Sequence, residues 1–95
     1  DFEEKAFYDI LKALAVKYDF VYPEDKLILL AKKVKEVVDD KAKYTDWSKR
    51  DDIKAELKVG LIILLAENGY PPVDRDEVYK EIFEQAENFK KYQNN

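Results

Sequence analysis

Few side chains in this sequence could take part in chemistry. It contains no cysteine and no histidine. Without cysteine there is no disulfide framework, no thiolate metal site and no cysteine nucleophile. Without histidine the commonest general base and metal ligand is missing. The single serine, Ser48, has no obvious base partner, so we interpret it as a helix cap and not as a nucleophile. The sequence therefore predicts no catalytic, cofactor-binding or metal-binding residue.

Two acidic pairs, Asp39-Asp40 and Asp51-Asp52, are the remaining candidates for a cation site. Calcium sites of the EF-hand kind take their oxygen ligands from spaced positions along a loop. Neither pair has that spacing, so no cation site is predicted. Asp51 and Asp52 are better explained by the start of a helix, where negative charge is favourable.

Basic residues form the clearest binding pattern. Arg50, Lys54 and Lys58 recur at every fourth position, which places them on one face of a helix, and Lys49 precedes them. This basic stripe could contact DNA phosphates or an acidic partner. It could instead be a solvated face paired with Glu56 and the neighbouring aspartates, which is the interpretation we favour.

Two aromatic residues, Trp47 and Tyr70, are further candidate interaction residues. Tryptophan is enriched among binding hot spots. It is also highly buried on average, so we expect Trp47 to close one end of the core beside Tyr70. Tyr70-Pro71-Pro72 could be a recognition element, and we interpret it as a rigid turn. The side chain of Asp46 is expected to cap or bond the local backbone.

Composition narrows the classes of function. With 95 residues, 46% of them hydrophobic and 40% charged, the chain is predicted to be one globular domain spanning residues 1–95. A net charge of −4 makes an autonomous DNA binder a poor fit, because nonspecific DNA binding depends on neutralising phosphates. The sequence has no signal peptide or membrane segment, and together with the missing cysteine this predicts a cytoplasmic protein. The chain starts at Asp1 and contains no methionine, so we expect a fragment of a longer protein.

A long central helix must position the basic stripe. We expect it to begin at Ser48, with Asp51 completing a capping box, and to end at Asn68-Gly69, where the glycine adopts a left-handed conformation. Residues 59–66 are apolar on all sides, which predicts a helix surrounded by partners. Gly60 among them indicates a close helix crossing.

Three more helices are expected over residues 3–18, 23–39 and 75–92, each with apolar residues at helical spacing. The last should begin at a capping box of Asp74 and Glu77. The aromatic residues of the connection 19–22 are expected to be pinned to the bundle. The predicted fold class is all-α, a compact array or bundle of about four helices.

Three segments occur in a fixed order: Glu4-Lys5-Ala6-Phe7-Tyr8-Asp9; Asp46-Trp47 with Lys49-Arg50 and Ile53-Lys54-Ala55-Glu56-Leu57-Lys58; and Tyr70-Pro71-Pro72 with Gln85-Ala86-Glu87. The first is similar to a Phe-Tyr-Asp-Ala-Leu motif. The second is similar to an Asp-Trp pair followed by a basic pair and a Val-Arg-Ala-x-Leu-Arg helix. The third is similar to Tyr-Pro-Pro and Gln-Ala-Glu motifs. Together they resemble the C-terminal helical domain of the R subunit of type I restriction enzymes, over essentially the whole chain.

Some positions depart from that family's pattern. Ile10 and Lys12 stand where alanine is expected, and Lys54 and Lys58 stand where arginine is usual. Lysine keeps the charge but loses the bidentate fork of arginine, and Glu56 adds an acid within the basic helix. These substitutions affect the expected phosphate-binding role of the stripe more than they affect the expected fold.

The resemblance implies that the parent subunit is an ATP-dependent DNA translocase and endonuclease. Its motor and nuclease domains, with the ATP and Mg²⁺ that they use, would precede this domain. No glycine-rich phosphate loop or nuclease carboxylate–lysine motif occurs here. The implied role is non-catalytic docking of the R subunit on the methyltransferase and specificity subunits, with DNA reached through the whole complex and no membrane involved. An accessory domain that contacts the DNA backbone and a generic helical interaction module are the alternatives.

Overall fold

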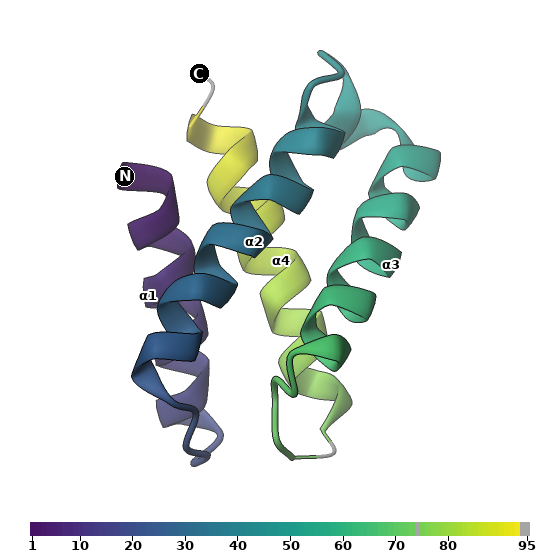
Figure 1. The fold of residues 1–95 in the computed structure, drawn as a ribbon. Coiled ribbons are helices and arrows are strands. Elements are labelled where there is room, and N and C mark those ends of the chain that lie inside the picture. The colour runs from purple at the N-terminus through teal and green to yellow at the C-terminus, as the bar shows by residue number, and fades with distance from the viewer. Residues whose placement is uncertain (74, 94–95) are drawn as a thin grey trace.

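Four antiparallel α-helices make up the fold in the computed structural model, which describes residues 1–73 and 75–93 (Figure 1). They are α1 (Phe2–Lys17), α2 (Glu24–Ala42), α3 (Asp51–Glu67) and α4 (Asp76–Gln93), with a short 3-10 helix, η1 (Trp47–Lys49), before α3. Within those two described ranges there is no strand. The predicted all-α class is confirmed.

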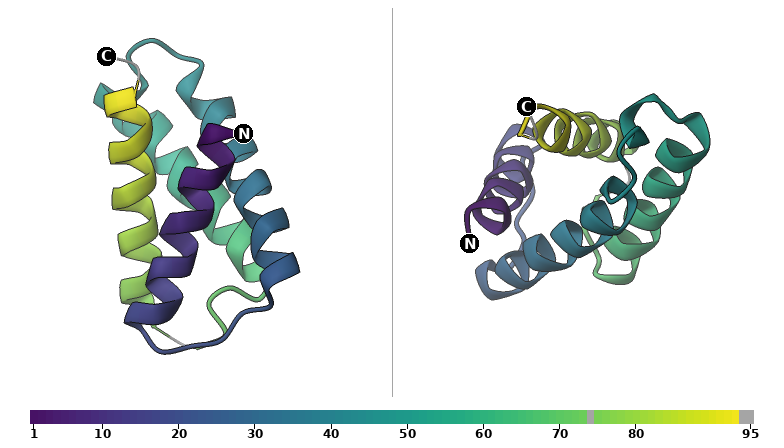
Figure 2. Two further views of the ribbon diagram at one scale, coloured as in Figure 1. Left: turned by 90° about the vertical axis from the view of Figure 1, so that its left-hand side faces the viewer. Right: turned by 90° about the horizontal axis from the view of Figure 1, so that it is seen from above.

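The helices form a ring around one core. Seen along the bundle, α1 and α3 lie diagonally opposite each other, and α2 and α4 fill the gaps between them (Figure 2). Each helix runs against the direction of the one before it, so the N-terminus and the end of α4 meet at the same end of the molecule. Short loops impose this up-down order, because they connect only neighbouring helices.

α1 and α2 begin at Phe2 and Glu24, each within one residue of the predicted start, and α2 ends later than predicted. The Asp1 carboxylate accepts a hydrogen bond from the Glu4 backbone N–H at 2.9 Å, which forms a capping box at the start of α1. Pro23 precedes the first residue of α2. The expected end near Asp39 is three residues early, because the sequence from 40 to 42 contains neither glycine nor proline to stop the helix.

The predicted start of α3 at Ser48 is wrong. Ser48 lies inside η1, and Arg50 occupies the N-cap position in an extended conformation without a side-chain cap bond. The Arg50 backbone N–H donates to the Trp47 carbonyl at 3.2 Å, so the chain makes a separate short turn before α3 begins. Asp51 and Asp52 then lie in the first helical turn, where their charge favours the helix dipole as expected.

The predicted end of α3 is confirmed in detail. Gly69 has a φ of 66°, in the left-handed region. Its N–H donates to the Ala66 carbonyl at 3.2 Å, and the Tyr70 N–H donates to the Leu65 carbonyl at 2.9 Å. These two bonds form a Schellman motif, which satisfies carbonyl groups that the helix itself leaves open.

One continuous apolar core lies inside the ring. Its buried residues are Phe7, Leu11, Leu14, Phe20, Leu27, Leu30, Ala31, Val34, Val38, Trp47, Ile53, Leu57, Leu61, Leu65, Tyr70, Val78, Ile82 and Ala86. The apolar stripes predicted for α1, α2 and α4 all contribute to it. The predicted capping box of α4 depends on Asp74, which lies outside the described residues.

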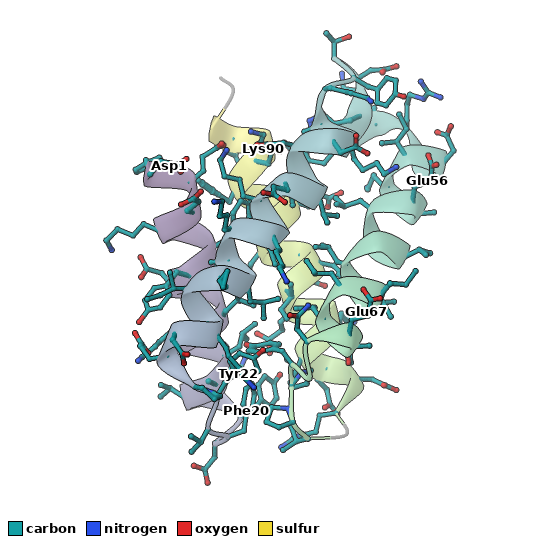
Figure 3. The ribbon with its side chains drawn as sticks, viewed as in Figure 1. Asp1, Phe20, Tyr22, Glu56, Glu67 and Lys90 are labelled. Carbon is teal, nitrogen blue, oxygen red and sulfur yellow. The ribbon has the colours of Figure 1, made fainter. Side chains whose placement is uncertain are left out.

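Aromatic side chains close one end of this core. Tyr70 is fully buried, and its hydroxyl donates to the Leu11 carbonyl at 2.7 Å. The rings of Phe20 and Tyr22 pack edge-on against Tyr70, with centroids 5.2 and 5.3 Å away (Figure 3). The Tyr22 hydroxyl donates to the Asn68 carbonyl at 2.6 Å. The expectation that the 19–22 aromatics are pinned to the bundle is confirmed.

The close crossing predicted at Gly60 is also present. A β-carbon at this position would lie 3.2 Å from Cγ1 of Val37 on α2. That separation is shorter than an ordinary contact between carbon atoms. Gly60 therefore lets α2 and α3 approach more closely than a side chain would allow.

We predict that Gly69→Ala destabilises the fold by about 1 kcal/mol, because an L-residue with a side chain is strained in the left-handed region. Apart from the chain neighbours of Gly69, no atom of the described residues lies within 4 Å of the added β-carbon, so the cost is conformational and not steric. Gly69→Asn should cost less, because asparagine tolerates this region. Urea unfolding followed by Trp47 fluorescence measures both. Equal losses for the two variants would contradict the conformational explanation.

Candidate interaction surface

Two of the six predicted interaction residues are buried. Trp47 is 4% exposed and Tyr70 is 0% exposed, so neither presents a surface to a partner. Trp47 precedes α3 and Tyr70 follows it, and 17 helical residues separate them by about 25 Å. The expectation that Trp47 lies beside Tyr70 is therefore wrong: each residue closes a different end of the core.

Lys49 and Arg50 are exposed where the chain enters α3. The Arg50 guanidinium donates from Nε and Nη2 to the two carboxylate oxygens of Asp52, at 3.3 and 2.8 Å. This contact lowers the pKa of Asp52. Arg50 also lies 5.9 Å from the centroid of the Tyr44 ring. Contrary to prediction, the Asp46 side chain makes no cap hydrogen bond with the described part of the chain, whereas its backbone carbonyl accepts from the Lys49 N–H at 2.9 Å.

The other two cations of the basic stripe have different surroundings. Lys54 forms an ion pair with Glu87 of α4 at 3.2 Å. Glu56, the expected partner of the stripe, instead lies 3.9 Å from Lys41 of α2. Lys58 is exposed and has no ion pair within residues 1–73 and 75–93. The stripe is therefore a partly paired edge between α3 and α4, and not a continuous row of free cations.

An exposed apolar surface lies on the outer side of α3, and the sequence interpretation missed it. Val59 is 55% exposed, Ile62 is 43% exposed and Ile63 is 53% exposed, and Ala55 and Ala66 are also exposed. These five residues recur at the spacing of one helix face, and we call them the α3 outer face. The prediction that residues 59–66 are surrounded by partners is wrong within this chain, because the ring of helices covers only the inner side of α3.

Shallow grooves run along both sides of the α3 outer face. The groove toward α4, here the α3–α4 groove, is lined by Lys58, Ile62, Asp76, Tyr79, Lys80 and Phe83. The groove toward α2 is lined by Lys41, Ala55, Glu56, Val59 and Gly60. Figure 3 labels Glu56 in the upper part of α3 and Glu67 at its lower end. The apolar face therefore has charged residues along both edges.

A network of ion pairs connects the helices at the end of the bundle that holds the start of α1 and the end of α4. Lys90 of α4 lies 2.8 Å from Glu3 of α1 and 2.9 Å from Asp39 of α2, and Lys35 lies 3.1 Å from Asp39. Figure 3 shows Lys90 close to the start of α1. Partial burial opposes ionisation of Asp39, but the ammonium groups of Lys90 and Lys35 outweigh it and lower the Asp39 pKa. The pKa of Lys90 is raised, because Glu3 and Asp39 outweigh its own partial burial.

This network predicts how stability depends on pH. A lowered carboxylate pKa gives stability that is present above the unfolded value and is lost as pH falls through the folded value. A raised lysine pKa gives stability that is lost only at alkaline pH, as pH rises through the folded value. Lys90→Gln should therefore cost about 1–2 kcal/mol at pH 7, and the cost should shrink below about pH 4, where carboxylates become protonated.

The matched control for this prediction is Lys91→Gln. Lys91 is the exposed neighbour of Lys90, with no ion pair in the described part of the chain. Its replacement should change the free energy of unfolding by less than about 0.5 kcal/mol. Urea unfolding of both variants at pH 7 and pH 3 provides the comparison. A Lys90→Gln cost that stays constant between these pH values would exclude the ion network as its origin.

Across residues 1–73 and 75–93, no three acidic side chains are grouped so as to hold a metal ion. None of the helices in the same ranges combines the length and the apolar character that a membrane crossing requires.

Comparison with known proteins identifies the family. The family model described as type I restriction enzyme HindI endonuclease subunit-like, C-terminal, matches residues 1–92. No significant match is found among curated proteins or among solved structures. The match confirms the resemblance carried by the three sequence segments. The chain belongs to the family of C-terminal domains of type I restriction enzyme HindI endonuclease subunit-like proteins.

Proposed function

We propose that this domain is a non-catalytic docking and structural domain at the C-terminus of a type I restriction R subunit. It would help to assemble the DNA-translocating and DNA-cleaving subunit with the methyltransferase and specificity subunits. ATP and Mg²⁺ would act in other domains of the parent subunit, DNA would be reached through the whole complex, and the complex would work in the cytoplasm.

The observation that carries this proposal is the α3 outer face. Val59, Ile62 and Ile63 are each about half exposed although the bundle already has a continuous core. A contiguous exposed apolar face is typical of a protein–protein contact, whereas isolated exposed apolar residues are ordinary.

The α3 outer face extends over about three helical turns and includes Ala55 and Ala66. The exposed pair Ile28 and Leu29 of α2 is smaller. A rigid bundle with such a face suits a docking role, because little conformational freedom would be lost on binding.

The charges of the domain support docking over direct DNA contact. Arg50 and Lys54 already have carboxylate partners, Asp52 and Glu87. The whole chain carries a net charge of −4. Affinity for a DNA backbone comes from cations that neutralise phosphates and release counterions. The cations of the basic stripe are therefore less available to neutralise DNA phosphates than their spacing in the sequence indicates.

We expect the 95-residue chain to co-elute with its cognate methyltransferase–specificity complex on a sizing column, at low micromolar concentration and moderate salt. An unrelated acidic helical protein of similar size, mixed with the same complex, is the control and should elute separately. Circular dichroism of the chain alone establishes that it is folded. A folded chain that elutes apart from the complex would contradict docking.

The same protein can then be titrated with duplex DNA at two salt concentrations. Under the docking proposal, binding should be negligible at moderate salt. A salt-sensitive affinity that weakens in Lys58→Glu would instead assign the domain to DNA contact.

A further inference from the structure

Charged residues lie along both edges of the α3 outer face, and only some of them form ion pairs with other described residues. Lys58 precedes Ile62 by one helical turn, and Glu67 follows Ile63 by one turn, so each charge lies directly beside an exposed isoleucine. Neither Lys58 nor Glu67 has an ion pair among the residues that the structure describes. This differs from Lys54 and Glu56, which contact Glu87 and Lys41.

The two edges differ in sign. On the α4 side, the α3–α4 groove contains the ammonium groups of Lys58 and Lys80 and the carboxylate of Asp76. The floor of this groove is apolar, from Ile62, Tyr79 and Phe83. Lys58 also borders a smaller pocket that Glu84 and Glu87 line. Glu87 is already paired with Lys54.

On the α2 side, Lys41 and Glu56 lie 3.9 Å apart and offset each other, and Glu67 adds a negative charge that no ion pair among the described residues offsets. A partner that fits this face needs apolar side chains in the centre, acidic groups toward α4 and a basic group toward Glu67.

We propose that the α3 outer face is the docking surface, and that its occupant is an amphipathic helix of the methyltransferase–specificity complex. This inference rests on the proposed docking function. The partner helix would lie along α3, with its apolar stripe on Val59, Ile62 and Ile63. Carboxylates along one edge would meet Lys58 and Lys80, and a basic residue on the other edge would meet Glu67.

The shape of the surface favours a helix over an extended peptide. The face is a ridge of side chains at helical spacing, with a groove on either side, which is the arrangement that helices use to pack ridges into grooves. Residues 55–66 span about 16 Å, or three helical turns. Residues 1–73 and 75–93 contain no strand whose edge an extended peptide could join.

The decisive variant is the double substitution Val59→Gln/Ile63→Gln. It removes two apolar side chains that are 55% and 53% exposed and keeps good helix formers in their place. The matched control is Ile28→Gln/Leu29→Gln on α2, where the exposed fractions are 59% and 54%. Both doubles should stay folded, because exposed positions contribute little to stability.

We expect the α3 double variant to weaken binding to the methyltransferase–specificity complex by about tenfold or more, as loss of central apolar contacts does. The α2 control should bind like the unmodified chain. Isothermal titration calorimetry of each folded variant measures the affinities. Equal affinities for both doubles, with the unmodified chain still binding, would overturn the assigned face and leave the docking function intact. Failure of the unmodified chain to bind would overturn the docking function itself.

A second pair of variants tests the charge pattern. Lys58→Glu should weaken binding by about threefold or more and reduce its sensitivity to salt. Lys26→Glu is the control, because Lys26 is an exposed lysine of α2 without an ion pair in the described ranges. Equal effects of the two substitutions would exclude acidic groups of the partner at the α4 edge.

Self-association is the remaining alternative occupant. Sedimentation velocity of the unmodified chain should show a monomer across the micromolar range. A dimer that dissociates in Val59→Gln/Ile63→Gln would overturn the proposal and assign the face to a second copy of the chain.

Discussion

The bond between the Tyr70 hydroxyl and the Leu11 carbonyl constrains the whole fold. Leaving a buried polar group without a partner costs about 1–3 kcal/mol, so this contact strongly restricts where Tyr70 can lie. Burial raises the pKa of the Tyr70 phenol well above its usual range, which keeps the hydroxyl protonated as a donor. Tyr70 directly follows the Schellman motif that ends α3, so its bond to Leu11 connects the end of α3 to α1.

Different interactions hold the two ends of the bundle together, and neither set of interactions involves the outer side of α3. Aromatic rings around Tyr70 close one end, and the ion pairs of Lys90 tie α1, α2 and α4 at the other. At the middle, Gly60 lets α2 approach the flank of α3. The core buries the inner stripe of α3, which comprises Ile53, Leu57, Leu61 and Leu65. The exposed isoleucines of that helix are not explained by the stability of this chain.

The helices could largely be predicted from the sequence, because apolar spacing reports burial directly. Leu27, Ala31 and Val34 are buried as their positions indicate. The start of α3 could not be predicted, since Ser48 followed by Asp51 fits a capping box equally well. The deciding contact, from the Arg50 N–H to the Trp47 carbonyl, depends on where Trp47 is buried. The separation of Trp47 from Tyr70 was available from the sequence, because a long helix between two residues places them at opposite ends.

In the candidate site too, features that depend on local spacing could be predicted, and features that depend on contacts between helices could not. Spacing correctly groups Lys54 with Lys58, but the partner of Lys54 is Glu87 on α4, and no local pattern could have identified it. The apolar character of residues 59–66 was visible from the start. The folded chain buries only the inner side of α3 and leaves Val59, Ile62 and Ile63 about half exposed. Under the proposed docking function, a partner would supply the burial that the apolar pattern predicts and this bundle does not provide.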